Sequence, residues 1–344
     1  MLDVTESVRR VASESGLSGV IRIDQSDHAL LSEAYGVAHR GFQVPNTVDT
    51  QFAIASGGKG FTALAVVSLI VEGLLSLDTT ARWMLGTDLP LIAEDVTVEH
   101  LLGHRSGIGD YIDEEDEDLA SNDYVLFSPV HELATTEAFL SEVDGYPTKF
   151  AAGERFSYCN GGYIVLALIA ERASGTPYHD LVKERVLVPA GMADTRFLRS
   201  DEPSGGMALG YLHPDGLQTN LLHLPVRGNG DGGIYTTVSD MHTFWNAFAD
   251  GRIVPNDWVV EMTRPHSVVP EENARYGLGF WLAETSPAVR LVGGDAGVSF
   301  CSVHDPTSRS TWTVMSNTTD GAWPMVKTLA ECYRQLTGGV KPDP

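Results

Sequence analysis

Short apolar and β-branched runs separated by polar turns occur near both ends of the chain, whereas longer apolar stretches occupy its middle. Residues 1–16 are amphipathic with a helical period, and residues 19–39 hold β-branched runs that predict two or three antiparallel strands. Beyond about Gly205 the chain becomes rich in turns. Strand-like runs then return at 276–284, 288–294, 298–305 and 310–318, and a last helix is predicted at 323–336.

The middle of the chain is mainly helical in its pattern. The stretch from Phe61 to Leu75 is apolar on every face, which predicts a helix that is buried all round and too short to span a bilayer. Further helices are predicted at 96–108, where Gly107 ends the helix, at 161–175 and at 178–192. This order of elements predicts an α+β fold, in which an antiparallel sheet flanked by helices is built from both chain ends around a mostly helical inserted subdomain.

We expect the 344 residues to form a single domain with two parts. Residues 1–75 and 205–344 would form the α/β subdomain, and residues 76–204 the mostly helical subdomain. Hydrophobic residues make up 43% of the chain and charged residues 20%, which is typical of a soluble globular protein with a sizeable core.

The charge balance narrows the choice of partners. Lys and Arg total 23 against 46 Asp and Glu, and the resulting net charge of −23 repels nucleic acid and anionic membrane surfaces. The acidic run at 112–123 is expected to be an exposed loop. Three cysteines without a CxxC pair predict neither a disulfide framework nor a zinc site. The polar N-terminus has no signal-like apolar region, so we expect a cytoplasmic protein.

Ser56-Gly57-Gly58-Lys59 is the first candidate for chemistry. If Ser56 begins the buried helix, Lys59 lies one turn further along on the same side. A serine hydroxyl needs an adjacent base to become a strong nucleophile, and a lysine serves as that base when desolvation or a nearby cation lowers its pKa. Gly57 and Gly58 would leave space beside the hydroxyl. Taken alone, the spacing equally fits a helix-capping serine and a surface lysine.

Tyr158-Cys159-Asn160 is the second candidate. In an extended loop, the phenol and the amide can face one cleft, where the phenol relays a proton and the amide holds a substrate carbonyl. Alternatively, Tyr158 packs at a helix start and Asn160 caps that helix.

Asp295-Ala296-Gly297, before a strand-like run, is the third candidate. The small residue and the glycine would let a substrate lie against the strand edge. The same residues also favour an ordinary β-turn.

Together these motifs resemble the serine β-lactamase-like and penicillin-binding-protein family, in the branch with class C β-lactamases, D-alanyl-D-alanine carboxypeptidases, D-aminopeptidases and related esterases. The resemblance runs in the family's order from near residue 19 to near residue 318. It includes the stretches 52–66, 96–108, 151–178, 186–197, 231–244, 276–282 and 314–317.

The resemblance implies a role for each motif residue. Ser56 would be the acylated nucleophile, Lys59 its proton acceptor and Tyr158 the relay to the leaving group. Asn160 would orient the substrate, which would lie beside Asp295 and Gly297. The backbone N–H groups of Ser56 and Val298 would form the oxyanion hole.

One departure from the family concerns substrate charge. The third element usually begins with Lys or His, which helps to hold a substrate carboxylate, whereas Asp295 would repel a carboxylate at close range. The sequence therefore predicts an ester or amide substrate, small or a short peptide, that is neutral or bears an amine. No metal or organic cofactor is implied. A catalytically silent ligand- or peptide-binding homologue, or an acyltransferase using the same site, remains an alternative.

Two further motifs are weaker. Gly228–Gly233 fits G-x-G-x-x-G but lacks the strand and βαβ unit of a dinucleotide site, and is better explained as a glycine-rich loop near the cleft. His100 and His104 have metal-ligand spacing, yet Leu101 stands where a zinc protease needs glutamate. We expect His104 to be a buried, hydrogen-bonded histidine.

Overall fold

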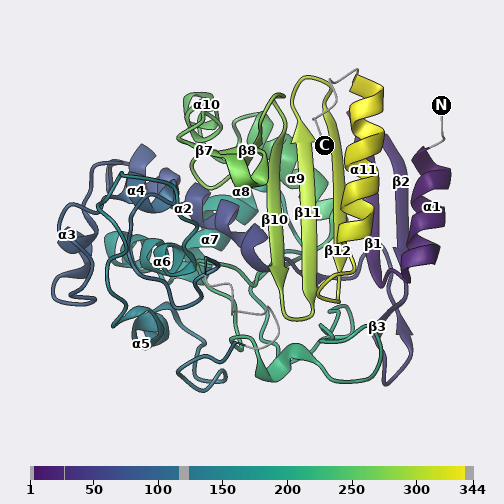
Figure 1. Ribbon diagram of the computed structural model, residues 1–344, viewed down its shortest axis with the longest axis horizontal. Coiled ribbons are helices and arrows are strands. Elements are labelled where there is room, and N and C mark those ends of the chain that lie inside the picture. Colours follow the sequence, from purple (N-terminus) through teal and green to yellow (C-terminus); the bar gives the residue numbers. More distant parts are fainter. Residues whose placement is uncertain (1–3, 27, 116–123, 338–344) are drawn as a thin grey trace.

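The computed structural model describes residues 4–26, 28–115 and 124–337. A sheet with helices on both faces occupies one end of the molecule, and a group of short helices joined by long loops occupies the other (Figure 1). Both termini lie at the sheet end, so the helical group is contributed by the middle of the chain.

The sheet is antiparallel and is built from both ends of the chain, as predicted. The first strand pairs along its whole length with the last one, from Gly19 opposite Ser316 to Gln25 opposite Ser310. In spatial order, the eight strands are β2 (His28–Tyr35), β1 (Gly19–Gln25), β12 (Ser310–Ser316), β11 (Val298–Asp305), β10 (Val289–Asp295), β9 (Trp281–Ala283), β8 (Ala274–Tyr276) and β7 (Ser267–Val269).

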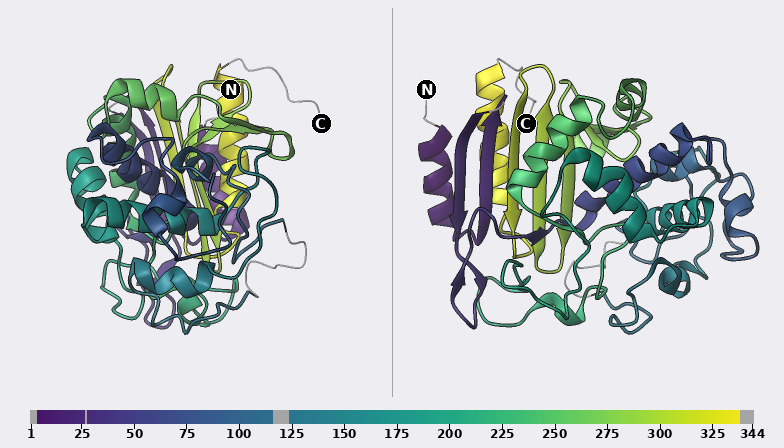
Figure 2. Two further views of the ribbon diagram at one scale, coloured as in Figure 1. Left: turned by 90° about the vertical axis from the view of Figure 1, so that its left-hand side faces the viewer. Right: turned by 180° about the vertical axis from the view of Figure 1, so that it is seen from behind.

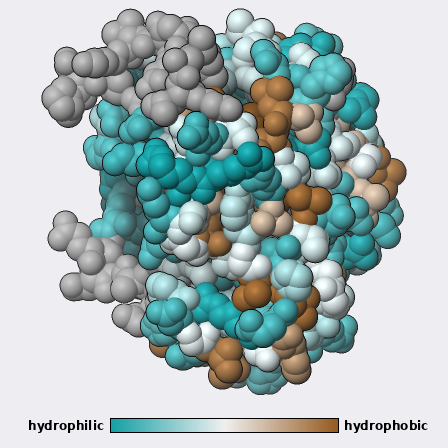
Figure 3. All heavy atoms as spheres, turned by 90° about the vertical axis from the view of Figure 1, so that its right-hand side faces the viewer, coloured by the Kyte–Doolittle hydropathy of each residue, from teal (hydrophilic) through white to brown (hydrophobic). Residues whose placement is uncertain are grey.

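Helices cover the two faces of the sheet unequally. Helices α1 (Val4–Ser15) and α11 (Trp323–Thr337) pack together on one face, where Val8 and Met325 are buried with strand residues. Helices α2 (Lys59–Val71) and α9 (Val238–Ala249) lie on the other face, which Figure 2 shows from behind. The outer surface beside α1 and β2 is mostly hydrophilic (Figure 3).

One hydrophobic core joins the sheet to the helical group. Leu101, Val165 and Leu291 belong to the same cluster of buried side chains, and α2 lies between the sheet and α6. The remaining helices are α3 (Ala81–Leu85), α4 (Val98–Leu102), α5 (Leu140–Val143), α6 (Asn160–Ser174), α7 (Tyr178–Val182), α8 (Val188–Ala190) and α10 (Asn256–Met262). The short paired strands are β3 (Val37–His39) with β4 (Val44–Pro45), and β5 (Phe52–Ala53) with β6 (Tyr235–Thr236).

Several predicted boundaries were wrong. The helix predicted at 96–108 stops at Leu102, since His104 has a left-handed backbone with φ 53°. The segment 178–192 divides into α7, a π-helical turn and α8. The run 276–284 is the end of β8, a turn and β9, rather than one strand.

The elements that the sequence analysis missed include α9, α10 and β7. Helix α9 begins inside a segment assigned to turns, because the Thr237 hydroxyl accepts a hydrogen bond from the Asp240 N–H at 3.1 Å and caps the helix. Of the acidic loop predicted at 112–123, residues 116–123 lie outside the described residues, while Glu114 and Glu115 are exposed. Within the described ranges, every helix is too short or too polar to traverse a bilayer.

Candidate active site

Ser56 lies in a 3₁₀ turn, Ala55–Gly58, between strand β5 and helix α2. Ala55 has a positive φ of 42°, a conformation that is costly for a residue with a side chain. Such strain occurs mainly where the surrounding structure enforces it, and functional sites are frequent examples. The Ser56 side chain is partly exposed and lines the main cavity of the molecule, so a ligand can reach its hydroxyl.

The glycines around Ser56 let three segments approach one another closely. A Cβ atom at Gly57 would lie 2.4 Å from the Phe300 ring, and one at Gly293 would lie 2.1 Å from the backbone oxygen of Ile54. At Gly232 it would lie 2.5 Å from the Ala55 oxygen. Glycine is thus needed at position 57 because the Phe300 ring occupies the place of a side chain.

Lys59 is buried to 2% exposure, and its ammonium nitrogen contacts three oxygen atoms. Its Nζ lies 2.9 Å from Ser56 Oγ, 2.8 Å from Asn160 Oδ1 and 2.8 Å from the Asp231 backbone oxygen. The predicted alternative of a surface lysine is excluded by this burial. The serine, the lysine and the asparagine are thus brought together from two helices that are about a hundred residues apart in the chain.

Tyr158 lies directly beside Ser56. Its phenol hydrogen-bonds to Ser56, and Lys59 Nζ is 4.9 Å from the centroid of its ring. Burial raises the pKa of Tyr158 well above its ordinary value, and the charge of Glu114 raises it further. The phenol therefore stays protonated near neutral pH and is available as a proton donor.

Asn160 is the first residue of helix α6, whereas the residue that caps this helix is Cys159. The extended backbone of Cys159 turns the side chains of Tyr158 and Asn160 towards the same cleft, as the spacing predicted. The Asn160 amide nitrogen donates to the Ile112 carbonyl at 3.0 Å and to Glu114 at 3.2 Å. These bonds orient its oxygen towards Lys59.

Two buried side chains fix the start of α6. Asp110 accepts hydrogen bonds from the N–H groups of Asn160 at 2.5 Å and Gly161 at 2.7 Å, and burial raises its pKa to about 6. His104 is buried and its Nδ1 accepts from the Cys159 N–H at 3.1 Å, which confirms its expected role. Asp110 was not predicted, since nothing in its local sequence distinguishes it from other acidic residues.

The third motif forms the turn between β10 and β11, with Asp295 paired to Val298. Gly297 has φ +70°, and a Cβ there would lie 2.8 Å from the Tyr211 nitrogen, so this position requires glycine for packing. Val298 lines the cavity beside Ser56. Asp295 Oδ1 accepts from the Tyr124 hydroxyl at 2.7 Å and from the Ala296 N–H at 2.8 Å, and burial raises the pKa of this carboxyl to about 6.

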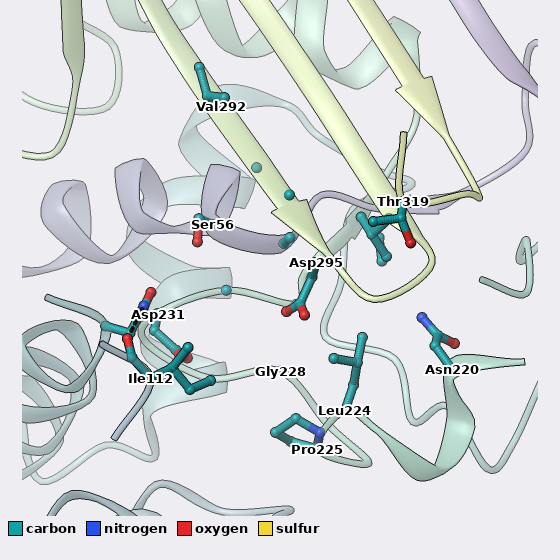
Figure 4. Close-up of a pocket in the computed structure, with 18 of the residues that line it drawn as sticks. Ser56, Ile112, Asn220, Leu224, Pro225, Gly228, Asp231, Val292, Asp295 and Thr319 are labelled. Carbon is teal, nitrogen blue, oxygen red and sulfur yellow. Dashed lines mark hydrogen bonds between the residues drawn. The ribbon is translucent and has the colours of Figure 1, made fainter. Parts of the chain in front are cut away.

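The cavity has a volume of about 590 Å³, and acidic side chains gather in it beside Ser56. Asp231, Asp295 and Glu114 line it and interact electrostatically, since the charges of Asp231 and Glu114 both raise the pKa of Asp295. Figure 4 shows the carboxylates of Asp231 and Asp295 facing the same space below Ser56. Among the described residues, no group of three or more acidic, histidine or cysteine side chains is arranged to hold a metal ion.

Asp231 belongs to the glycine-rich loop 228–233, which lines the cavity as expected. Its carboxylate accepts a hydrogen bond from the Tyr111 hydroxyl, and burial raises its pKa. Neither Asp231 nor Glu114 was predicted as a site residue. The glycine-rich context of Asp231 was a usable signal, whereas Glu114 was one carboxylate within a long acidic run.

Comparisons with known proteins agree with this arrangement. A match to the family described as Beta-lactamase covers residues 6–330. Penicillin-binding protein 4* of Bacillus subtilis (strain 168) is 28% identical over 323 residues, which are 87% of this chain and 68% of that protein. A D-aminopeptidase of Brucella anthropi is 28% identical over 291 residues, which are 81% of this chain and 51% of that protein.

A solved structure shows the same fold. The crystal structure of a penicillin binding protein from Bacillus halodurans is similar to this chain with a TM-score of 0.88 and 33% sequence identity. The similarity covers 94% of this chain and 99% of that one. It therefore includes both the sheet and the helical group.

Proposed function

Because the chain belongs to the Beta-lactamase family, we propose that it is a serine hydrolase whose nucleophile is Ser56. Family membership confirms the resemblance and the fold class that the sequence predicted. The observation that carries the proposal is the 2.9 Å contact between Lys59 Nζ and Ser56 Oγ, at the wall of a cavity that a small substrate can enter. The relatives of this chain include a D-aminopeptidase and an esterase, and both names denote hydrolases.

The contacts of Lys59 support its role as the base. A neutral amine has two N–H bonds and one lone pair. The oxygens of Asn160 and Asp231 would accept the two hydrogen bonds, which leaves the lone pair directed at the Ser56 hydroxyl. Lys59 would then take the serine proton as Oγ attacks the substrate.

The acylation step needs a donor for the leaving group and a site for the oxyanion. Ser56 Oγ forms an ester with the acyl carbon, and the bond to the leaving amine or alcohol breaks. The proton taken from Ser56 would reach the leaving group through Tyr158, which burial keeps in its protonated form. The backbone N–H groups of Ser56 and Val298 would hold the oxyanion.

Hydrolysis of the acyl-enzyme closes the cycle. Water attacks the ester carbon and gives one proton to Lys59, and Ser56 leaves as the alcohol while the acid is released. If an amine or an alcohol takes the place of water, the same site transfers the acyl group. No step of this cycle calls on a metal or an organic cofactor.

The charge of the cavity favours a substrate with a free amine. Three interacting carboxylates lie beside Ser56, and an ammonium group gains from each of them, whereas a carboxylate at the same place is repelled. The relationship to a D-aminopeptidase fits this preference. We therefore propose an amine-bearing ester or amide as the substrate class, in preference to a carboxylate-bearing β-lactam.

Intact-protein mass spectrometry tests the nucleophile. The wild type, Ser56→Ala and Ser200→Ala would each be treated with a fluorophosphonate, an activated alanyl ester and a penicillin. Ser200 is a matched control, because it lines the same cavity and its hydroxyl has no hydrogen-bond partner among the described residues. With the fluorophosphonate and the alanyl ester, we expect a single adduct in the wild type and in Ser200→Ala, and none in Ser56→Ala.

The reagents separate the remaining possibilities. Labelling by the ester but not by the penicillin supports the amine-bearing substrate class, while rapid penicillin labelling contradicts it. If no reagent labels the wild type and no alcohol is released from the ester, the protein is a catalytically silent binder and the proposal is wrong.

A further inference from the structure

Apolar side chains form part of the cavity wall close to the carboxylates. Four of them are only partly buried and line the cavity: Ile112, Leu126, Leu224 and Pro225. These four side chains form the apolar patch of the cavity. Figure 4 shows Ile112 and Leu224 on opposite sides of the space below Asp295. Because burial of an apolar group releases water from both surfaces, the patch favours an apolar part of a ligand.

The apolar patch adjoins the carboxylates because the same chain segments carry both sets of contacts. Ile112 directly follows the tyrosine whose hydroxyl donates a hydrogen bond to Asp231. Leu126 lies two residues after the tyrosine whose hydroxyl donates to Asp295 at 2.7 Å. An α-amino acid carries its ammonium group and its side chain on one carbon atom. The cavity can therefore receive the ammonium group at the carboxylates and the side chain at the patch.

Two hydrogen bonds hold the loop 220–226 in its place at the cavity. Asn220 Nδ2 donates to the Ala296 carbonyl at 2.8 Å, in the turn between β10 and β11. At the other end of the loop, the Val226 N–H donates to the Val130 carbonyl at 2.9 Å. The loop is thus tied to both neighbouring segments, so its part of the apolar patch is in place before a substrate binds. A binding surface that is already ordered loses less entropy when the ligand arrives.

We propose that the apolar patch binds the side chain of an aminoacyl substrate, and that Leu224 and Leu126 select a side chain that is apolar and larger than that of alanine. This proposal rests on the proposed function, which places the amine of the substrate beside Asp295. It narrows the substrate to an ester or amide of an amino acid with a branched or aromatic apolar side chain. The carboxylates select the amine, and the patch selects what the same carbon atom carries.

Polar residues of the same cavity make the choice of test substrates decisive. Ser200 and Asn229 also line it, and their side chains hold buried polar atoms that lack a hydrogen-bond partner within the described residues. A polar side chain of the substrate would be favoured if these two residues made the selection. Leucine and asparagine have side chains of nearly the same shape, so a comparison of the two separates apolar from polar recognition.

Three aminoacyl anilides test the proposal by activity. The 4-nitroanilides of leucine, asparagine and alanine share one leaving group, so their rates differ only through the aminoacyl part; both configurations of each are used. The wild type, Leu224→Asn and Leu222→Asn are compared. Leu222 is the matched control, since it belongs to the same loop, is 80% exposed and is not among the residues that line the cavity.

The expected result is a preference for leucine that depends on Leu224. In the wild type, kcat/KM should be about 10- to 100-fold higher for the leucyl than for the asparaginyl anilide, as an apolar pocket allows. Leu224→Asn should lower kcat/KM for the leucyl anilide about tenfold more than for the alanyl anilide, whereas Leu222→Asn should keep the wild-type preference. A wild type that hydrolyses the asparaginyl anilide as fast as the leucyl one, or equal losses on the leucyl and alanyl anilides in Leu224→Asn, would overturn the proposal.

A binding measurement separates this proposal from the proposed function. Isothermal titration of Ser56→Ala with leucinamide and with asparaginamide does not depend on turnover. Tighter binding of leucinamide, lost in Ser56→Ala/Leu224→Asn, supports the apolar patch even if the wild type hydrolyses no anilide and the proposed function fails. Equal affinity for the two amides, tighter binding of asparaginamide, or no binding of leucinamide overturns the assignment of the patch, whatever the activity.

Discussion

The two walls of the cavity beside Ser56 are built in different ways. Lys59 and Asn160 stand at the starts of α2 and α6, where buried helices fix their backbones and every polar atom of the lysine head has a partner. Asp295 ends strand β10, Asp231 and Glu114 lie in loops, and all three line the cavity. The proposed reactive groups are therefore held by buried helix starts, whereas the carboxylates proposed to select the substrate come from a strand end and two loops.

The largest loss of activity is expected from a substitution at Lys59, on the wall formed by Lys59 and Asn160. Lys59→Met keeps an apolar chain of similar length in the buried position but removes the base, so kcat/KM should fall by about 10²- to 10⁴-fold. Steady-state hydrolysis of an activated alanyl ester measures this, with Lys183→Met as an exposed control and thermal unfolding as a check on folding. Full activity in Lys59→Met would mean that another group accepts the serine proton.

A smaller loss of activity, limited to amine-bearing substrates, is expected from a substitution at Asp295, on the wall that also holds Asp231 and Glu114. Asp295→Asn keeps the oxygen that accepts from Tyr124 and Ala296 but removes the charge. For an alanyl amide, kcat/KM should fall by about 10- to 100-fold, while its N-acetylated counterpart should change little, because only the first carries an ammonium group.

Asp320→Asn is the matched control for this comparison. Asp320 is an exposed carboxylate that lines the same cavity, so its substitution removes an equal charge from the chamber. If both variants lose the same activity on the alanyl amide, the overall field of the cavity, and not Asp295, selects the amine.

The smallest expected effect is a pH dependence of the preference for the substrate with a free amine over its N-acetylated counterpart. The pKa of Asp295 is raised to about 6, so its carboxylate is charged above that pH and becomes neutral below it. The preference for the free amine over the N-acetyl substrate should fall by up to about tenfold between pH 7 and pH 5.

The measured quantity is the ratio of kcat/KM for the two substrates. This ratio is needed because the pKa of Asp110 is also raised to about 6, and protonation of Asp110 affects both substrates alike. In Asp295→Asn the ratio should be flat over this range. A ratio that still changes near pH 6 in that variant would assign the titration to another carboxylate.

The sequence analysis found features whose signal lies within a short stretch of the chain, and it missed features that depend on residues far apart in the chain. Ser56 and Lys59 were identified because a reactive pair at helical spacing sits at the start of an apolar run. Asp110 and Glu114 were missed because their importance depends on Asn160, which lies about fifty residues away along the chain. Helices α9 and α10 were missed since turn residues at their starts concealed their apolar faces.

The sequence by itself determined the antiparallel sheet built from both chain ends, the buried helix after Ser56 and the family of the chain, because periodicity and motif spacing are local properties. Only the tertiary structure decided which acidic side chains meet at the cavity and that Phe300 fills the space at Gly57. The physical reason is that burial, pairing and pKa depend on neighbours brought together by folding, and these neighbours are distant in the chain.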